Sequence, residues 1–140
     1  MAANTINVFW REDGSATVLG RVTARDGTGD WTGIAGEGRF LKQADLSTIT
    51  CNVFDLESST PTTATVSPTI TISSAIQDTP VTNGYIWNLD EIGYNFVHDL
   101  ASTVFTTSDR VWRVEYKFTT TGGTVGWGVY EGKALPVYTS

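Results

Sequence analysis

Hydrophobic and polar side chains alternate most regularly over residues 110–118, in the last third of the chain. Strict alternation places one set of side chains on the buried face of an extended strand and the other set in water. The apolar set is Trp112, Val114, Tyr116 and Phe118. Gly122 and Gly123 follow, and glycine readily adopts the positive φ that a tight turn needs. Because alternation resumes over residues 125–130, the pattern predicts a β-hairpin.

Shorter runs of β-branched and aromatic residues, bounded by turn-forming residues, precede this hairpin and are typical of strands. Near the N-terminus they predict a strand at 6–10, a turn at 12–15 and a return strand at 17–23. Further strands are predicted at 49–56, 66–73 and 94–100, a helical turn at 42–46, and polar loops at 25–33 and 57–65. Residues 33–38 contain several glycines, so the pattern does not decide between a strand and a loop there.

No segment shows the apolar period of a helix, so the chain is expected to be all-β. We expect one domain over residues 1–140, a single antiparallel β-sandwich with short tails at 1–5 and 134–140. The stretch from Asp90 through Gly93 and Tyr94 to Phe96 resembles the start of the sixth strand of immunoglobulin-like domains, where a tyrosine folds back onto the preceding turn. Phe96 stands where antibody domains have cysteine. The expected fold is an immunoglobulin-like β-sandwich.

The composition fits a globular domain and excludes some kinds of partner. The chain has 140 residues, 40% hydrophobic and 17% charged, which is enough for one full core. With 9 Lys and Arg against 15 Asp and Glu, the net charge is −6, so binding of nucleic acid through a basic surface is not expected. The first residues do not resemble a secretion signal, and no apolar run could span a membrane. We therefore expect synthesis in a cytoplasm and no membrane partner.

Candidate nucleophiles and bases are few. A general base needs a nucleophile within hydrogen-bond reach and a third group that orients it. The one histidine, His98, follows no nucleophile motif, and we interpret it as a structural residue of a strand. The one cysteine, Cys51, lies in an apolar run and is interpreted as buried filler. The sequence therefore predicts no catalytic residues.

Acidic and glycine-rich stretches give no better site. The adjacent carboxylates Asp90–Glu91 and Glu12–Asp13 are not expected to oppose each other as glycosidic acid/base pairs do. The oxygen-rich loop 26–30 lacks the ligand alternation of a calcium loop, and the glycine spacing over 27–33 does not fit a dinucleotide loop. We expect no metal and no cofactor.

The five tryptophans are the remaining residues that could indicate a binding site. Trp112 and Trp127 lie in alternating strands and are expected in the core, whereas Trp31 and Trp87 lie in loop-like segments. Exposed tryptophans serve as protein–protein anchors or as platforms on which sugars stack. Covering the edge of the core is an alternative of about equal weight for Trp31 and Trp87.

Residues 93–105, followed by 112–119, resemble the closing strands of small immunoglobulin-like proteins of tailed bacteriophages. Residues 46–55 are similar to the N-terminal module of phage baseplate upper proteins, and the two likenesses cover about two-thirds of the chain. The resemblance implies a virion component and carries over no catalytic residue. It implies a capsid cement or decoration protein, or a neck, tail or baseplate adaptor.

The function expected from this resemblance is non-enzymatic. The partners would be the major capsid protein or other virion proteins, with self-association into a homo-oligomer. The candidate interface residues are Trp31, Trp87 and, in the C-terminal tail, Tyr138. The competing hypothesis of another class is a carbohydrate-binding module that uses Trp31 and Trp87 as stacking platforms, and an enzyme ranks third.

Overall fold

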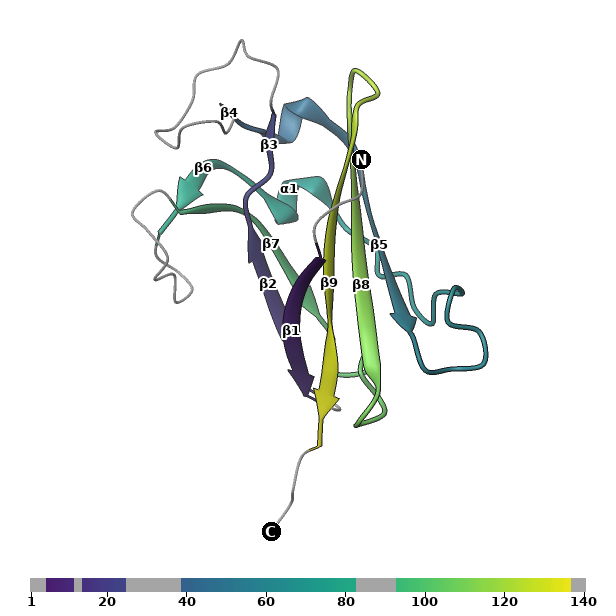
Figure 1. The fold of residues 1–140 in the computed structure, drawn as a ribbon. Helices are drawn as coiled ribbons and strands as arrows, with labels where there is room; N and C mark the ends of the chain where they lie inside the picture. The colour runs from purple at the N-terminus through teal and green to yellow at the C-terminus, as the bar shows by residue number, and fades with distance from the viewer. Residues whose placement is uncertain (1–4, 12–13, 25–38, 83–92, 137–140) are drawn as a thin grey trace.

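The chain folds almost entirely into β-strands, and the computed structural model describes residues 5–11, 14–24, 39–82 and 93–136 (Figure 1). The helical elements are single turns, η1 (Gln43–Asp45) and α1 (Ile72–Ala75). The strands are β1 (Thr5–Arg11), β2 (Ala16–Gly20), β3 (Thr23–Ala24), β4 (Arg39–Phe40), β5 (Leu46–Asp55), β6 (Ile76–Val81), β7 (Tyr94–Leu100), β8 (Val111–Thr120) and β9 (Val125–Leu135). The expected all-β fold is confirmed.

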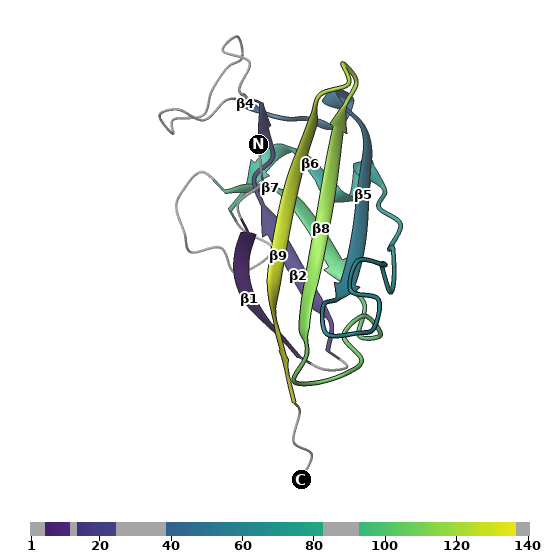
Figure 2. The same ribbon diagram turned by 45° about the vertical axis from the view of Figure 1, so that its right-hand side comes forward.

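Two sheets face each other as the layers of a sandwich (Figure 2). One sheet has the strand order β1-β9-β8-β5, the other has the order β2-β7-β6, and β3 pairs with β4 in a separate ribbon. The antiparallel triplets β5-β8-β9 and β2-β7-β6 correspond to the strand neighbours of an immunoglobulin-like sandwich. The sandwich expected from the sequence is therefore confirmed.

Two details of that expectation are wrong. The first sheet is mixed, because β1 runs parallel to β9, from Thr5 opposite Val129 to Arg11 opposite Leu135 (Figure 1). Tyr94 also does not begin the sixth strand of the immunoglobulin order. It begins β7, which lies between β2 and β6 in the place of the fifth strand, while β8 takes the sixth place between β5 and β9.

The hairpin predicted over residues 110–130 is present as β8 and β9. Its turn contains Gly123 at φ 89°, which explains the need for glycine there. The apolar face of β8 is buried as expected, with Trp112, Val114, Tyr116 and Phe118 against the second sheet. β9 continues through the fully buried Ala134 to Leu135, so the expected tail boundary at 134 is wrong.

The N-terminal hairpin is not formed. β1 pairs with β9 and β2 pairs with β7, so the chain crosses from one sheet to the other between them. Because β1 and β2 lie in different sheets, Trp10 and Val18 are buried between the two layers. Burial of this apolar surface favours the crossing over a hairpin in which β1 pairs with β2.

The strand predicted over 66–73 is also absent. Val66 makes only an isolated bridge to Val53, and the chain then passes through Pro68, which has no N–H to donate. Ile70 and Ile72 instead place their side chains partly against the core, and α1 begins at Ile72.

Aromatic rings fill both ends of the sandwich. At the end where β8 begins, Trp10 stacks on Phe105 at 4.4 Å between ring centroids, and Phe105 meets Trp112 edge to face. At the end where β8 finishes, Phe96 meets Tyr116 and Phe118 edge to face at 5.1 and 5.2 Å. The second cluster forms the floor of the site described next.

Candidate functional site: a groove at the open edge of β9

Glycines on the inner face of β9 open a groove between the two sheets. Gly126 is opposite Phe118 and Gly128 is opposite Tyr116, so the inner face of β9 has no side chain where β8 has two rings. No atom outside the neighbouring residues lies within 4 Å of the position that a Cβ of Gly126 would occupy. The resulting cavity has a volume of about 690 Å³, within the range of small-ligand and side-chain pockets.

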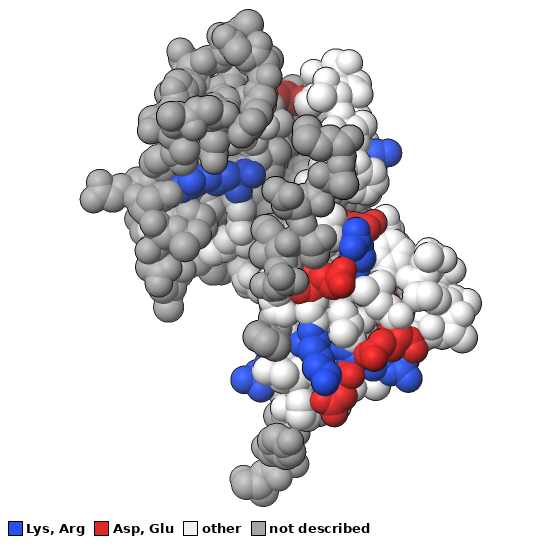
Figure 3. Space-filling view, viewed as in Figure 1, with Lys and Arg blue, Asp and Glu red and all other residues white. Residues whose placement is uncertain are grey.

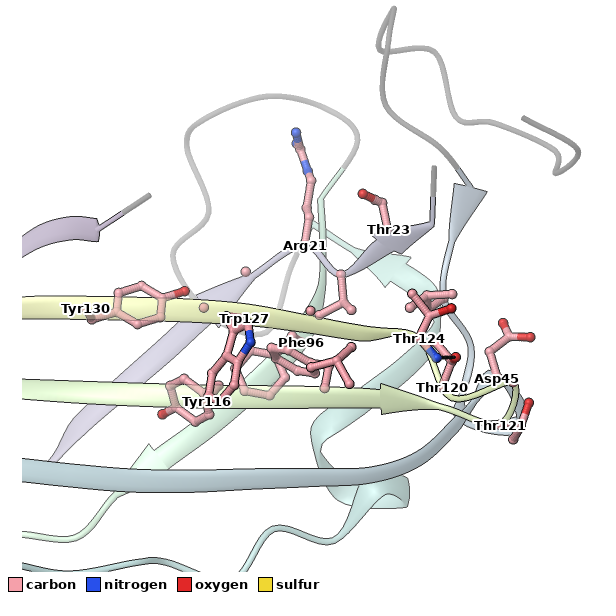
Figure 4. A pocket seen from close by; sticks show the side chains of 18 residues that line it. Arg21, Thr23, Asp45, Phe96, Tyr116, Thr120, Thr121, Thr124, Trp127 and Tyr130 are labelled. Carbon is pink, nitrogen blue, oxygen red and sulfur yellow. Dashed lines mark hydrogen bonds between the residues drawn. The ribbon is translucent and has the colours of Figure 1, made fainter. Parts of the chain in front are cut away.

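Aromatic and aliphatic side chains line the groove (Figure 4). We call the rings of Phe96, Tyr116 and Phe118 the floor of the groove and the lining residues Val22 and Leu41 its far wall. Because these rings already pack edge to face, the floor is a fixed surface. The groove is thus suited to apolar or ring-shaped groups.

Hydroxyl groups surround the mouth of the groove. Figure 4 shows Thr120, Thr121 and Thr124 gathered at the hairpin turn, with Thr23 across from them and Tyr130 farther along β9. Hydrogen bonds within the hairpin turn and to η1 hold these threonines in place. Thr124 N–H donates to Thr120 Oγ1 (3.0 Å), and Thr121 N–H donates to the Asp45 carbonyl (3.0 Å). This rim offers hydrogen-bond donors and acceptors without charge.

The two charged residues that line the groove are both engaged by backbone groups. Arg21 Nε donates to the Gly93 carbonyl at 2.8 Å. Asp45 Oδ2 accepts from the Lys42 N–H at 2.8 Å, which also closes the helical turn η1. The other residues that line the groove are uncharged, so its lining best matches a ligand with apolar and neutral polar parts.

A buried amide positions the far wall. Asn95 is fully buried, and its Oδ1 accepts from Val22 N–H (2.7 Å) while its Nδ2 donates to the carbonyls of Val22 (2.9 Å) and Leu41 (3.0 Å). The side chain thereby substitutes for backbone pairing between two segments far apart in the sequence. It holds the two groove-lining residues, Val22 and Leu41, at a fixed distance from β7.

The outer face of β9 carries the exposed apolar side chains nearest to the groove. Val125 is 43% exposed and Trp127 is 48% exposed. Lys117 lies on the neighbouring strand with its Nζ 5.6 Å from the centroid of the Trp127 ring. The expectation that Trp127 is a core residue is wrong, because the glycines of β9 face inward and its larger alternate residues face outward.

Elsewhere on this sheet face, charges are paired. Arg113 donates to Glu115 (2.9 Å) and Glu131 (3.0 Å), and bonding to both carboxylates raises the pKa of the guanidinium. Figure 3 shows basic and acidic groups interleaved over the described part of this face. Among the described residues, the large apolar side chains that are exposed are Val125, Trp127 and, to a smaller extent, Val66.

A short chain of polar groups crosses the core below the groove. His98 Nδ1 and the Tyr116 hydroxyl are 2.8 Å apart, and the hydroxyl also meets the Cys51 thiol. Burial raises the pKa of Cys51 to about 12 and, against the opposing effect of Asp99, lowers the pKa of His98. The thiol therefore stays protonated at neutral pH, which a nucleophile would not. Cys51 is buried, as the sequence predicted.

A smaller hollow of about 330 Å³ lies on the other side of His98, bordered by Thr71, Ser74 and Asp99. The Asp99 carboxylate accepts a hydrogen bond from Thr17 Oγ1 at 2.6 Å on the neighbouring strand β2. Within the described ranges, no group of three or more His, Cys, Asp or Glu side chains could hold a metal ion.

Several residues singled out from the sequence lie outside the described residues. These are the interface candidates Trp31, Trp87 and Tyr138, the carboxylate pairs at 12–13 and 90–91, and the glycine-rich segments 26–30 and 33–38. The groove was missed because its main determinants are absent side chains. A signal was nevertheless present, since Gly126, Gly128 and Gly132 all fall on the strand face opposite Trp127.

In the part of the chain that the structure describes, no helix has the length and apolar character needed to cross a membrane. Comparisons of the chain with protein-family models, with curated proteins and with solved structures found no match. The candidate site therefore depends on its own geometry.

Proposed function

We propose that this chain is a non-enzymatic structural protein of a bacteriophage particle, a capsid cement or decoration protein that acts through protein–protein contacts. The observation that carries the proposal is the groove together with the exposed Val125 and Trp127 at the open end of β9. Exposed apolar side chains beside a preformed hollow are typical of protein interaction sites. The likeness of residues 93–105 and 112–119 to phage proteins supplies the virion context.

The state of the titratable groups supports binding over catalysis. The Cys51 thiol has its pKa raised to about 12, and the ring of His98 is held against Tyr116. Arg21 and Asp45 at the groove are bonded to backbone atoms. The groove consequently offers shape, aromatic surface and hydroxyl groups, and these contribute to recognition.

A single contact through the groove would be weak, and many identical contacts on one particle would raise the overall affinity. A decoration protein docks at many equivalent positions, and linked or repeated contacts raise the overall affinity by about 10² to 10⁴ without new interactions. In this proposal the partner is the major capsid protein, and a homo-oligomer on the particle supplies the repetition. The alternative role in the virion is that of a neck, tail or baseplate adaptor.

Sedimentation of particles tests the proposal. Particles are purified through a density gradient from a lysate of cells that carry the genome encoding this chain. We expect the chain to sediment with the particles in stoichiometric amounts and to rebind after it has been stripped. Its absence from all particle fractions, while it is abundant in the soluble fraction, would refute a virion role.

The groove also favours a second candidate, a carbohydrate-binding module. Aromatic side chains beside several threonine hydroxyls provide stacking and hydrogen bonds to a neutral sugar. Titration with a panel of soluble polysaccharides, followed by tryptophan fluorescence, tests this candidate. Trp127→Phe should remove the fluorescence change if Trp127 is the platform, and no change with any polysaccharide would reject the candidate.

A further inference from the structure

Beside the groove, part of the β9 edge has no neighbouring strand among the described residues. Thr120 N–H donates to the Thr124 carbonyl (2.9 Å) at one end of the hairpin, and Ala134 N–H donates to the Arg110 carbonyl (2.9 Å) at the other. Residues in an antiparallel pair alternate in bonding toward and away from the partner. Even-numbered residues of β9 therefore bond to β8, and odd-numbered residues direct their N–H and C=O groups to the opposite edge.

β1 pairs with only part of that edge. Its first residue, Thr5, is opposite Val129, and the pairing continues from there to Leu135. Among the described residues, no strand faces Val125 or Trp127. Their side chains are 43% and 48% exposed, and Gly126 between them is exposed too. An exposed strand edge of this kind is a template for another strand.

The groove begins on the inner side of the same edge. Val125, Gly126, Trp127 and Gly128 all line it, and the space beside Gly126 is empty. A strand added at this edge would alternate its side chains, with one set in the groove and the other beside Trp127. The open edge and the empty space thus match the two requirements of strand addition, backbone bonds and pockets for alternate side chains.

We propose that the edge of β9 at residues 125–128 binds an extended segment of a virion partner as an added strand. The segment inserts an uncharged apolar side chain into the groove over Gly126 and Gly128. About four residues, roughly 13 Å of extended chain, span the open edge. The inserted side chain is apolar because the aromatic rings of Phe96, Tyr116 and Phe118 line the groove below the two glycines. This inference rests on the proposed virion function and specifies how the partner is held.

A second copy of this chain does not fit the same site. Two copies that paired through this edge of β9 would place the glycines of one inner face beside the glycines of the other. Neither copy would supply a side chain for the groove, and the aromatic floor would stay uncovered. The occupant is therefore a partner whose segment alternates apolar and polar residues.

Filling the groove from within tests the inference. Gly126→Leu supplies a side chain where there is room for one, and its backbone φ is not positive, so the fold should be retained. We expect binding to stripped particles to fall about tenfold or more, as for loss of a central interface pocket. Thr48→Ile is the matched control, because it adds an apolar side chain at an exposed position of β5 and should bind as the unmodified chain does.

Removing one backbone N–H at the open edge of β9 tests whether the partner segment binds through backbone hydrogen bonds. Val125→Pro deletes the N–H that faces the open edge, and Val125→Thr keeps it with a side chain of similar shape. Binding to particles should fall with proline and persist with threonine. Equal binding by Gly126→Leu, Val125→Pro and the unmodified chain would overturn strand addition while leaving the virion function intact, whereas failure of the unmodified chain to bind particles would overturn both.

Amide hydrogen exchange in the free chain gives a result independent of particles. The amides of Val125 and Trp127 should exchange quickly and those of Gly126 and Gly128, which bond to β8, slowly. Protection of Val125 and Trp127 in the free chain would show that the edge is already occupied and would overturn the inference. Protection of these amides by a soluble polysaccharide would assign the groove to a sugar and also overturn it.

Discussion

Replacing Asn95 by alanine should destabilise the fold by about 3 kcal/mol, because the partly buried Val22 N–H and the buried Leu41 carbonyl lose the hydrogen-bond partner that Asn95 gives them. Asn95 makes three hydrogen bonds of 2.7 to 3.0 Å to Val22 and Leu41. The Val22 carbonyl retains the Leu41 N–H at 2.9 Å, so the orphaned groups are the Val22 N–H and the Leu41 carbonyl. Each orphaned group costs about 1 to 2 kcal/mol, and the lost side-chain contacts account for the remainder.

Urea unfolding followed by tryptophan fluorescence measures this loss, and a drop of this size lowers Tm by roughly 10 °C. Asn52→Ala is the matched control, since the Asn52 amide oxygen accepts a hydrogen bond from the exposed Ser67 hydroxyl, and it should change stability by less than about 0.5 kcal/mol. Asn95→Asp keeps the acceptor for Val22 N–H but sets a carboxylate against two carbonyls, so it should be worse than alanine at neutral pH. If Asn95→Ala lay within about 1 kcal/mol of Asn52→Ala, the reasoning on buried partners would be refuted.

Four further predictions follow from single positions. Gly132→Ala should lower the thermal midpoint by several degrees, because a Cβ there would collide with the carbonyl oxygen of Val8, and an unchanged midpoint would contradict this close approach. Cys51, with its pKa raised to about 12, should resist iodoacetamide in the folded chain and react in urea, and equal rates in both states would contradict its burial. The pKa of His98 is lowered from 6.5 by burial, so the unfolded chain binds the proton first and the free energy of unfolding should fall as pH drops below 6.5. Ring titration by NMR checks this, and a midpoint above 6.5 would contradict it. Trp127→Ala should reduce the free energy of unfolding by less than about 1 kcal/mol in urea, since Trp127 is 48% exposed on the outer face beside Lys117, and a loss above about 2 kcal/mol would place it in the core.

The strands whose own side chains decide their burial could be predicted from the sequence. Trp112 to Phe118 alternate with charged residues, and the apolar set packs against the second sheet as expected. Gly123 adopts the positive φ that the turn requires. In both cases the determining interaction is local, because strand alternation and turn geometry depend on residues that are neighbours in the chain.

The arrangements that depend on distant residues could not be predicted. The apolar run that contains Trp10 gives no sign that its partner is β9 and not β2, because both pairings bury the same side chain. In the sequence, Asn95 is one polar residue within a predicted strand. Its role is visible only in the structure, where its buried side chain bonds to the backbone of Val22 and Leu41. The groove depends on which face of β9 turns inward, and Trp127 was expected to occupy that face.

The parallel pairing of β1 with β9 also sets the order in which the molecule can be completed. Thr5 leaves the ribosome early but must wait for Val129, and at typical elongation rates the delay is roughly ten seconds. During that interval the strand that carries Trp10 has no permanent neighbour, and such long-range pairing slows folding. Nascent chains that stall before β9 would present two unsatisfied strand edges at once, on β1 and on β8. We therefore expect chaperones to bind this chain during its synthesis, while these strand edges are unpaired.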